Sequence, residues 1–235
     1  MSRCRRSLGW ALGLTLLLGS VAPAAEPEAG ASRSSLGVKR HSLKELRDRY
    51  VVKQRLDYSC GAAALATLMR YYFGDTTSEH DVLRLLVARL DADERRVREM
   101  RGFSLLDLKY AAEALGYRAA GFKLTIADLP RLAAPVIVFV RPLGYEHFAV
   151  LRGISAGRVF LADPARGNVR MSIGRFLGEW DGIVFVLGKP GEEAIHAHPL
   201  SVPRTDDINP PLRSVNPLWE SGAGSIDLSR RLRLP

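Results

Sequence analysis

Residues 54–73 of this 235-residue chain read QRLDYSCGAAALATLMRYYF, and they decide how the remainder is interpreted. Apolar residues recur at helical spacing from Cys60 onward and stop at Gly74, which predicts a helix that begins at the cysteine. Unpaired backbone N–H groups and the positive end of the helix dipole stabilise a thiolate at such a position. Gly61 and the alanines keep bulk away from the sulfur. The stretch therefore indicates a thiol that is activated by its position at the start of a helix.

The N-terminus has the pattern of a secretory signal peptide. Three arginines within residues 3–6 precede an apolar run at 8–18 and a small-residue stretch at 21–25, which predicts a signal peptide over residues 1–25. Retention of this segment as an anchor is the alternative. It is also the one expected route to a membrane, because no other segment approaches roughly 20 apolar residues.

Cleavage of the signal changes both the charge and the cysteine count. The formal net charge falls from +9 to +6, and Cys60 becomes the only cysteine of the mature chain. In an oxidising compartment an unpaired cysteine is a hazard. Cys60 is therefore either an inert core residue or a thiol kept for its chemistry. The moderate positive charge comes without a basic helix or aromatic platform, so nucleic acid is not an expected partner.

The remaining sequence divides into a lead-in, one domain and a tail. Residues 26–49 read as a flexible lead-in with helical character near its end, residues 50–188 as one domain, and residues 189–235 as a disordered or extended tail. Seven of the thirteen prolines fall in the last 46 residues. Leu218-Trp219 there is either a docking motif for secretion components or an incidental apolar pair in a solvated tail, and the second reading is favoured.

The domain changes its hydrophobic period at Gly116. Helical spacing before this glycine and strand-like alternation after it predict an α+β fold with a mostly antiparallel sheet. The expected helices cover 60–73, 78–90 and 104–115, the expected strands cover 117–124, 135–141, 146–154, 158–162 and 182–187, and short helices are expected at 126–132 and 173–180.

A thiolate nucleophile needs a proton-transfer partner, usually a histidine. Of the five histidines, one lies in the lead-in, two lie in the tail and one lies on a charged helix: His41, His196, His198 and His80. His147 remains, and it opens the apolar strand 147–151 after a turn. A histidine at a strand end is well placed to face a cleft. The tail histidines lack further ligands at suitable spacing, so neither a metal nor another cofactor is expected.

Asp163 and Gln54 supply the other groups that acyl chemistry requires. If His147 begins one strand and Asp163 ends its antiparallel neighbour, the hairpin brings acid and base together; the alternative is that Asp163-Pro164 is an ordinary turn. Gln54 stands six residues before Cys60, where its amide and the backbone N–H of the nucleophile could stabilise an oxyanion. The four residues follow in the order Gln, Cys, His, Asp.

These residues resemble a known family. Gln54, the Cys60-Gly61 helix start, residues 102–105 and 111–116, the strand at His147 and Asp163-Pro164 are similar to cysteine peptidase family 39, the double-glycine leader peptidases of bacteriocin export. The resemblance covers residues 50–187. It implies a papain-like fold in which an N-terminal helical lobe packs on a mostly antiparallel sheet. It also implies Cys60 as nucleophile, His147 as general base and acid, Asp163 as orienting group and Gln54 in the oxyanion hole.

Two departures from the best-known members limit that carry-over. Those members are fused to ABC exporters, whereas this sequence shows no transmembrane bundle and no phosphate-binding loop, so ATP is not an expected ligand. Tyr58-Ser59 also precedes Cys60 where the exporter-linked enzymes usually have an acid. A stand-alone exported member resembles the peptidase-like accessory proteins of functional-amyloid fibre secretion in Gram-negative bacteria.

The expected function is that of a periplasmic cysteine endopeptidase. It would cut an extended polypeptide after small residues such as Gly-Gly, in protein export or fibre secretion. Two alternatives stay open: a peptide-binding accessory module that does not hydrolyse, and an acyl transferase that uses an amine in place of water. Sequence does not separate hydrolysis from transfer, because the two differ in how the cleft admits water.

Overall fold

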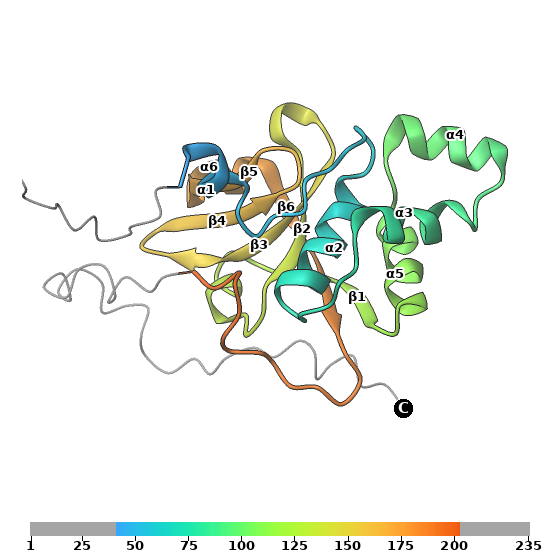
Figure 1. Ribbon diagram of the computed structural model, residues 1–235. Helices are drawn as coiled ribbons and strands as arrows, with labels where there is room; N and C mark the ends of the chain where they lie inside the picture. The colour runs from blue at the N-terminus through green and yellow to red at the C-terminus, as the bar shows by residue number, and fades with distance from the viewer. Residues whose placement is uncertain (1–40, 203–235) are drawn as a thin grey trace, which may run out of the picture. The chain divides into compact units, whose positions relative to one another are not determined.

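The computed structural model describes residues 41–202, and helices come first and a sheet second in this part of the chain (Figure 1). The expected α+β class is thereby confirmed. The expected signal peptide and Leu218-Trp219 lie outside the described residues. The helices are α1 (Leu43–Asp48), α2 (Cys60–Tyr71), α3 (Glu79–Val87), α4 (Ala92–Arg101), α5 (Leu105–Ala114) and α6 (Ile173–Glu179), with 3-10 turns η1 (Leu129–Arg131) and η2 (Pro142–Gly144). The strands are β1 (Arg118–Lys123), β2 (Val136–Val140), β3 (His147–Ser155), β4 (Arg158–Asp163), β5 (Gly167–Ser172) and β6 (Trp180–Gly188).

Serine side chains cap the starts of four helices, α1, α3, α5 and α6. Ser78 before α3 and Ser104 before α5 each accept a hydrogen bond from the backbone N–H three residues on, and the aspartate there bonds back to the serine N–H. Such reciprocal boxes satisfy two otherwise unpaired donors at the helix start. Helix α2 begins differently: Ser59 makes no side-chain cap bond, and the helix buries every residue from Cys60 to Met69.

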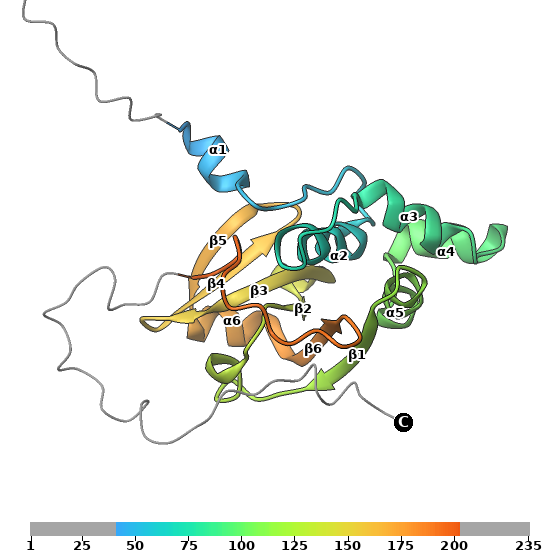
Figure 2. The ribbon, with the colours of Figure 1, turned by 60° about the horizontal axis from the view of Figure 1, so that its bottom comes forward.

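The sheet has six strands in the order β1-β6-β2-β3-β4-β5, and every neighbouring pair is antiparallel. Alternation along β3 separates two cores: Phe148 and Val150 pack with α2, α3 and α5, whereas Ala149 and Leu151 pack with Phe176 of α6. Helices α2 and α6 accordingly lie on opposite faces of the sheet (Figure 2). This arrangement places the start of α2 beside the start of β3.

Two elements are absent from the expectations drawn from the sequence. Helix α4 has no buried residue, so it carries no apolar stripe by which a helix could be recognised. Strand β5 pairs with β4 along its whole length, yet its sequence GNVRMS shows little alternation. The remaining elements agree with expectation to within a few residues at their ends.

The last residues of the expected lead-in, 41–49, are helical in part and lie against the domain. They contain α1, and the carbonyls of Leu46 in this helix and of Arg49 just after it accept hydrogen bonds from the Asn168 side chain at 3.3 and 2.7 Å. A Cβ on Gly167 would lie 2.6 Å from the carbonyl oxygen of Arg47, so glycine is required for this close approach.

Residues 189–202 form no helix or strand, but they pack against the domain. The Leu200 side chain is fully buried, and Arg152 donates to the carbonyls of Leu200 and Ser201 at 3.0 Å each. Arg152 also donates to Asn168 Oδ1 at 2.7 Å. Arg152 and Asn168 thus connect α1 to this C-terminal segment.

Candidate active site

Cys60 is the first residue of α2, and its side chain is almost completely buried. It forms no disulfide. Gly61, the next residue, is what allows α2 to come so close to its neighbours: an added Cβ would lie 2.9 Å from Leu108 of α5 and 3.2 Å from Phe148 of β3. Because Phe148 follows His147, this packing holds the start of α2 against the start of β3.

The β3–β4 hairpin brings His147 and Asp163 together at one end of the sheet, as the hairpin geometry predicts. His147 Nε2 lies 3.0 Å from Asp163 Oδ1, and both side chains are buried. Since Nε2 faces the carboxylate, Nδ1 is the ring nitrogen left for the thiol of Cys60, with which His147 also forms a hydrogen bond. The structure therefore joins Cys60, His147 and Asp163 in one chain of polar contacts.

Asp163 is fixed by the loop that follows it. Its Oδ1 accepts hydrogen bonds from the backbone N–H groups of Ala165 and Arg166, both at 2.8 Å, in addition to His147. The Arg166 guanidinium donates to Oδ2 at 2.8 Å. The contact of Arg166 with Asp163 was not predicted from the sequence, although an arginine three residues after an aspartate in a turn is a pattern that indicates an ion pair. A fully buried carboxylate needs such partners to remain charged.

These contacts set the charge state of the pair. Burial by itself would lower the pKa of His147, but hydrogen bonds to Asp163 and Cys60 outweigh it and raise that pKa from 6.5 to about 9. Burial would likewise raise the pKa of Asp163, but His147 and Arg166 hold it well below its usual range. His147 therefore carries a proton at neutral pH, which is the state that stabilises a neighbouring thiolate.

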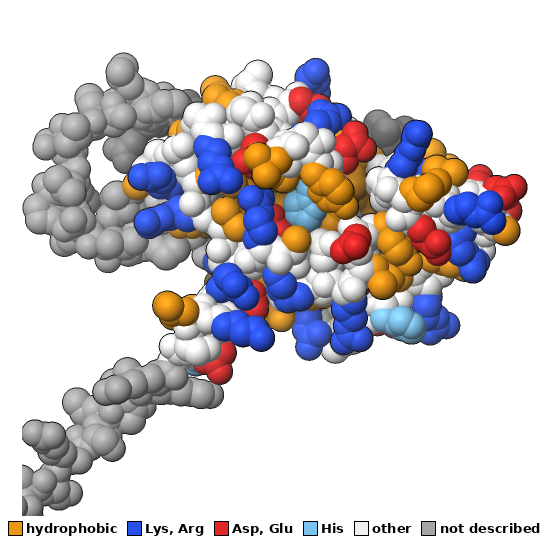
Figure 3. Space-filling view, turned by 90° about the horizontal axis from the view of Figure 1, so that it is seen from above, with side chains coloured by type: hydrophobic (Ala, Val, Ile, Leu, Met, Phe, Trp, Pro, Cys, Tyr) orange, Lys and Arg blue, Asp and Glu red, His pale blue; other side chains and the backbone are white. Residues whose placement is uncertain are grey.

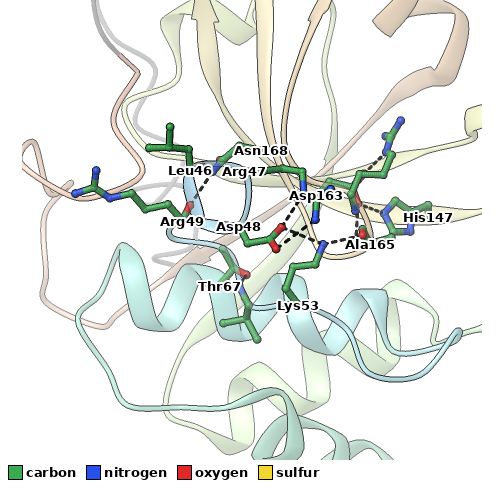
Figure 4. A network of polar contacts seen from close by, with 12 residues as sticks. Leu46, Arg47, Asp48, Arg49, Lys53, Thr67, His147, Asp163, Ala165 and Asn168 are labelled. Atoms are coloured by element: carbon green, nitrogen blue, oxygen red, sulfur yellow. Dashed lines mark hydrogen bonds and ion pairs between the residues drawn. The ribbon is translucent and has the colours of Figure 1, made fainter. Parts of the chain in front are cut away.

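The segment before the nucleophile is docked onto the loop after Asp163. Lys53 Nζ donates to the Ala165 carbonyl at 2.7 Å and lies 3.8 Å from Asp48 Oδ1, as Figure 4 shows. The Gln54 N–H donates to the Pro164 carbonyl at 3.1 Å. The chain before Cys60 and the chain after Asp163 thus hold each other in register.

Gln54 lies in this docked segment, and its side chain turns back on its own loop. Nε2 donates to the Leu56 carbonyl at 3.0 Å and to the Asp57 carbonyl at 3.4 Å. Oε1 is buried and has no partner within residues 41–202. The structure therefore places Gln54 between Asp163 and the nucleophile loop, with its amide oriented by two backbone carbonyls.

A hollow of about 570 Å³ opens beside Cys60. It is lined by Cys60, by residues 57–58 of the loop before it, by residues 99–102 at the end of α4 and by residues 144–146 of the β2–β3 loop. Tyr145 Oη donates to the Asp57 carbonyl at 3.3 Å and so links two of these segments. Figure 3 looks onto the face that is uppermost in Figure 1, where hydrophobic side chains and a histidine at the centre are surrounded by charged groups.

The other histidines are separate from this site. His80 and His196 are exposed, and His198 stacks edge-on against Tyr72, with ring centroids 4.8 Å apart. Among residues 41–202, no group of three or more His, Cys, Asp or Glu side chains is placed to hold a metal ion. No helix in the same range is long and apolar enough to cross a membrane.

A cysteine at a helix start, a histidine at a strand end and a buried aspartate define a papain-like cysteine peptidase. The chain belongs to the peptidase C39 family, whose model matches residues 48–192. The resemblance inferred from the sequence is thereby confirmed, and with it the cysteine peptidase class.

Similar proteins support the same assignment. The chain is 42% identical over 158 residues to the probable functional amyloid protease FapD of Pseudomonas fluorescens, which covers 66% of this chain and 68% of the relative. It is 37% identical over 162 residues to the protein of the same description from Pseudomonas aeruginosa, covering 69% and 70%. Among solved structures, the peptidase domain of Streptococcus ComA, a bifunctional ABC transporter involved in quorum sensing, superposes with a TM-score of 0.51 at 25% identity, covering 59% of this chain and 97% of that domain.

Proposed function

We propose that this chain is an exported cysteine endopeptidase that cuts an extended polypeptide after small residues such as Gly-Gly, in the periplasm, during processing of a fibre subunit or of another secretion component. The observation that carries the proposal is the buried Cys60–His147–Asp163 chain at the edge of the hollow. The likeness to two probable functional amyloid proteases supports the choice of substrate class. The signal-like residues 1–25 support the location.

The reaction follows from the roles that the geometry permits. The Cys60 thiolate adds to the scissile carbonyl carbon, and the tetrahedral oxyanion accepts hydrogen bonds from the Cys60 backbone N–H and the Gln54 side-chain amide. Collapse breaks the C–N bond, and the His147 imidazolium gives its proton to the departing amine. His147 then takes a proton from water, which attacks the thioester and releases the second product with Cys60 restored.

Cys60 is almost completely buried beside the hollow, which supports a preference for small residues at the cleavage site. Gly102 and Gly144 line the hollow, and the Tyr145–Asp57 contact joins two of its walls. A substrate with small side chains at the cleavage site reaches Cys60 without displacing these loops. An extended backbone meets the same requirement, because it presents its carbonyl groups at the surface of the peptide.

The test uses the purified mature chain and peptides that contain Gly-Gly within varied flanks, with cleavage read by mass spectrometry. Cys60→Ala should lower the cleavage rate by at least about 1000-fold, because no second nucleophile replaces the sulfur. His147→Ala should slow both cleavage and alkylation of Cys60 by iodoacetamide. His80→Ala, which removes an exposed histidine of α3, is the matched control and should leave both rates unchanged.

Four outcomes would reject parts of the proposal. Full activity in Cys60→Ala would refute the nucleophile assignment. A reactive thiol with no cleavage, together with tight peptide binding, would identify a peptide-binding module instead. Products joined to an added amine would identify an acyl transferase. Recovery of the chain outside a periplasmic extract, with residues 1–25 still attached, would refute the proposed location.

A further inference from the structure

We propose that Glu79, the first residue of α3, is a positioning residue for the peptidase reaction, because one of its carboxyl oxygens sets the loop that joins Gln54 to Cys60. The inference rests on the proposed role of Cys60 as nucleophile. Glu79 lies outside the Cys60–His147–Asp163 chain. Glu79 is nevertheless buried, with a relative exposure of 5%.

Two donors from opposite ends of the loop meet at the same oxygen of Glu79. The backbone N–H of Arg55, the residue after Gln54, donates to Oε1 at 2.9 Å. The hydroxyl of Ser59, the residue before Cys60, donates to Oε1 at 2.5 Å. The position of one atom therefore fixes the distance between the two ends of the loop.

Ser59 extends this restraint into the loop itself. Its hydroxyl oxygen accepts the Leu56 N–H at 3.1 Å, and its backbone N–H donates to the Leu56 carbonyl at 3.1 Å. Ser59 is fully buried, so these bonds are not exchanged for bonds to water. Glu79 and Ser59 together hold Leu56 in a defined orientation.

Leu56 and the next residue then hold the amide of Gln54. Nε2 of Gln54 donates to the carbonyls of Leu56 and Asp57, and the 3.0 Å bond to Leu56 is the shorter of the two. An amide nitrogen carries two hydrogens. One of them stays bonded to the Leu56 carbonyl. During the reaction the other leaves its 3.4 Å contact to the Asp57 carbonyl and donates to the oxyanion beside Cys60. Glu79 thus orients the oxyanion donor through three residues of the loop.

This role predicts that acyl transfer to Cys60 and alkylation of Cys60 respond differently to a change at Glu79. With p-nitrophenyl acetate, the sulfur adds to the ester carbonyl, an oxyanion forms, and p-nitrophenolate leaves to give the acetyl thioester. With iodoacetamide, the sulfur displaces iodide from carbon and no oxyanion forms. A donor that acts on the oxyanion therefore accelerates only the first reaction.

The experiment measures both rates on the full mature chain for the wild type, Glu79→Ala, Glu79→Gln and Gln54→Ala. Glu79→Ala should lower the acylation rate at least about tenfold and the alkylation rate less than about twofold, which is the pattern that Gln54→Ala should also give. Glu79→Gln keeps an oxygen that accepts both donors, so it should restore acylation to within about threefold. Glu113→Ala, an exposed glutamate of α5, is the control for loss of a surface carboxylate.

The double variant with Gln54→Ala and Glu79→Ala should be no slower in acylation than Gln54→Ala alone, because Glu79 acts through Gln54. Ser59→Ala removes one of the two donors and serves if Glu79→Ala does not fold. Equal losses in both reactions would overturn the proposal and assign Glu79 to folding, and unchanged acylation would overturn it as well. A wild-type protein that neither acylates nor alkylates would refute the nucleophile assignment and, with it, the role of Glu79, and this result is distinct from a loss seen only in the variants.

Discussion

Two hydrogen bonds decide the charge of His147 at neutral pH. Asp163 on one side and Cys60 on the other raise its pKa to about 9 against the cost of burial, so the imidazolium form persists over the physiological range. The same bonds orient the ring: Nε2 is taken by Asp163, and only Nδ1 can exchange a proton with the sulfur or the leaving group. The same two hydrogen bonds therefore determine both the charge of His147 and the orientation of its ring.

The raised pKa of His147 makes the stability of the fold depend on pH. A group with a higher pKa in the folded state stabilises the fold fully below its unfolded pKa, near 6.5, and this contribution is lost as pH rises through about 9. The free energy of unfolding, measured by urea denaturation, should therefore fall between pH 6 and pH 10. The His147 contribution to that fall is on the order of 3 kcal/mol.

His147→Ala and His80→Ala isolate this contribution. The first should show a smaller fall over the same pH interval by that amount, whereas the second should match the wild type. A His147→Ala variant that loses as much stability as the wild type would contradict the assigned pKa shift. The cavity that His147→Ala creates lowers the free energy of unfolding by the same amount at every pH, so it does not affect the comparison of the two pH slopes.

The residues proposed to react give a clearer signal in the sequence than the residues that support them. Cys60 and His147 stand at the start of regular elements, and position at an element end is readable from hydrophobic period. Glu79 gave no such signal, because its partners are a backbone N–H and a hydroxyl some twenty residues away along the chain. Contacts of that kind follow from how α3 packs beside the nucleophile loop, which no local pattern encodes.

At the scale of elements, the first turn of α2 depends on a residue without a side chain. A Cβ at Gly61 would lie 2.9 and 3.1 Å from the two methyl groups of Leu108 and 3.2 Å from Phe148. Leu108 is fully buried, so its methyl groups have little space into which to move. The contact between the helical lobe and the sheet at the active site is set by this glycine.

Gly61→Ala should therefore destabilise the protein despite the better helix propensity of alanine. Overpacking costs about 1–3 kcal/mol, whereas the propensity gain is at most about 1 kcal/mol, so a net loss of about 1 kcal/mol and a Tm lower by about 3 °C are expected by calorimetry. Gly174→Ala is the matched control, since Gly174 holds the same second position in α6 and a Cβ there would have nothing within 4 Å.

The result for Gly174→Ala should be an unchanged or slightly higher Tm. An equal loss in both variants would show that the first helical turn, and not the packing at Gly61, is sensitive to the methyl group. Gly61→Ala should also slow alkylation of Cys60, because Phe148 carries His147 with it when it shifts.

Among the helices between Cys60 and Ala114, those with a buried face could be predicted from the sequence, and the one without a buried face could not. Helices α2, α3 and α5 bury a face and were expected, whereas α4 buries nothing and was not. The segment 189–202 shows the converse problem: its composition indicates a tail, but Leu200 is fully buried through side-chain contacts that have no period. Tertiary packing, and not local preference, decided both cases.

On the scale of the whole molecule, the residues proposed to be catalytic come from distant parts of the described chain. Gln54 and Cys60 lie in its first third, and Asp163 lies in its last third. The docking of Lys53 and Gln54 on residues 164–165 joins the two regions at the site itself. Formation of the active site therefore requires the helical lobe and the complete sheet, so it should be acquired only when the whole domain has folded.

The Arg152–Asn168 contact, which connects α1 to the C-terminal segment, makes the domain a candidate for circular permutation. Because two side chains bridge from Arg49 to Ser201, a Gly/Ser linker long enough to run along α1 can join Val202 to His41. New ends can be opened between Ala156 and Gly157, an exposed turn at the far end of the β3–β4 hairpin from His147. The permuted domain should melt within about 5 °C of residues 41–202 in their natural order and alkylate at Cys60 at the same rate. A permutant that folds but fails to alkylate would show that the order of the chain, and not only its packing, is needed to set the site.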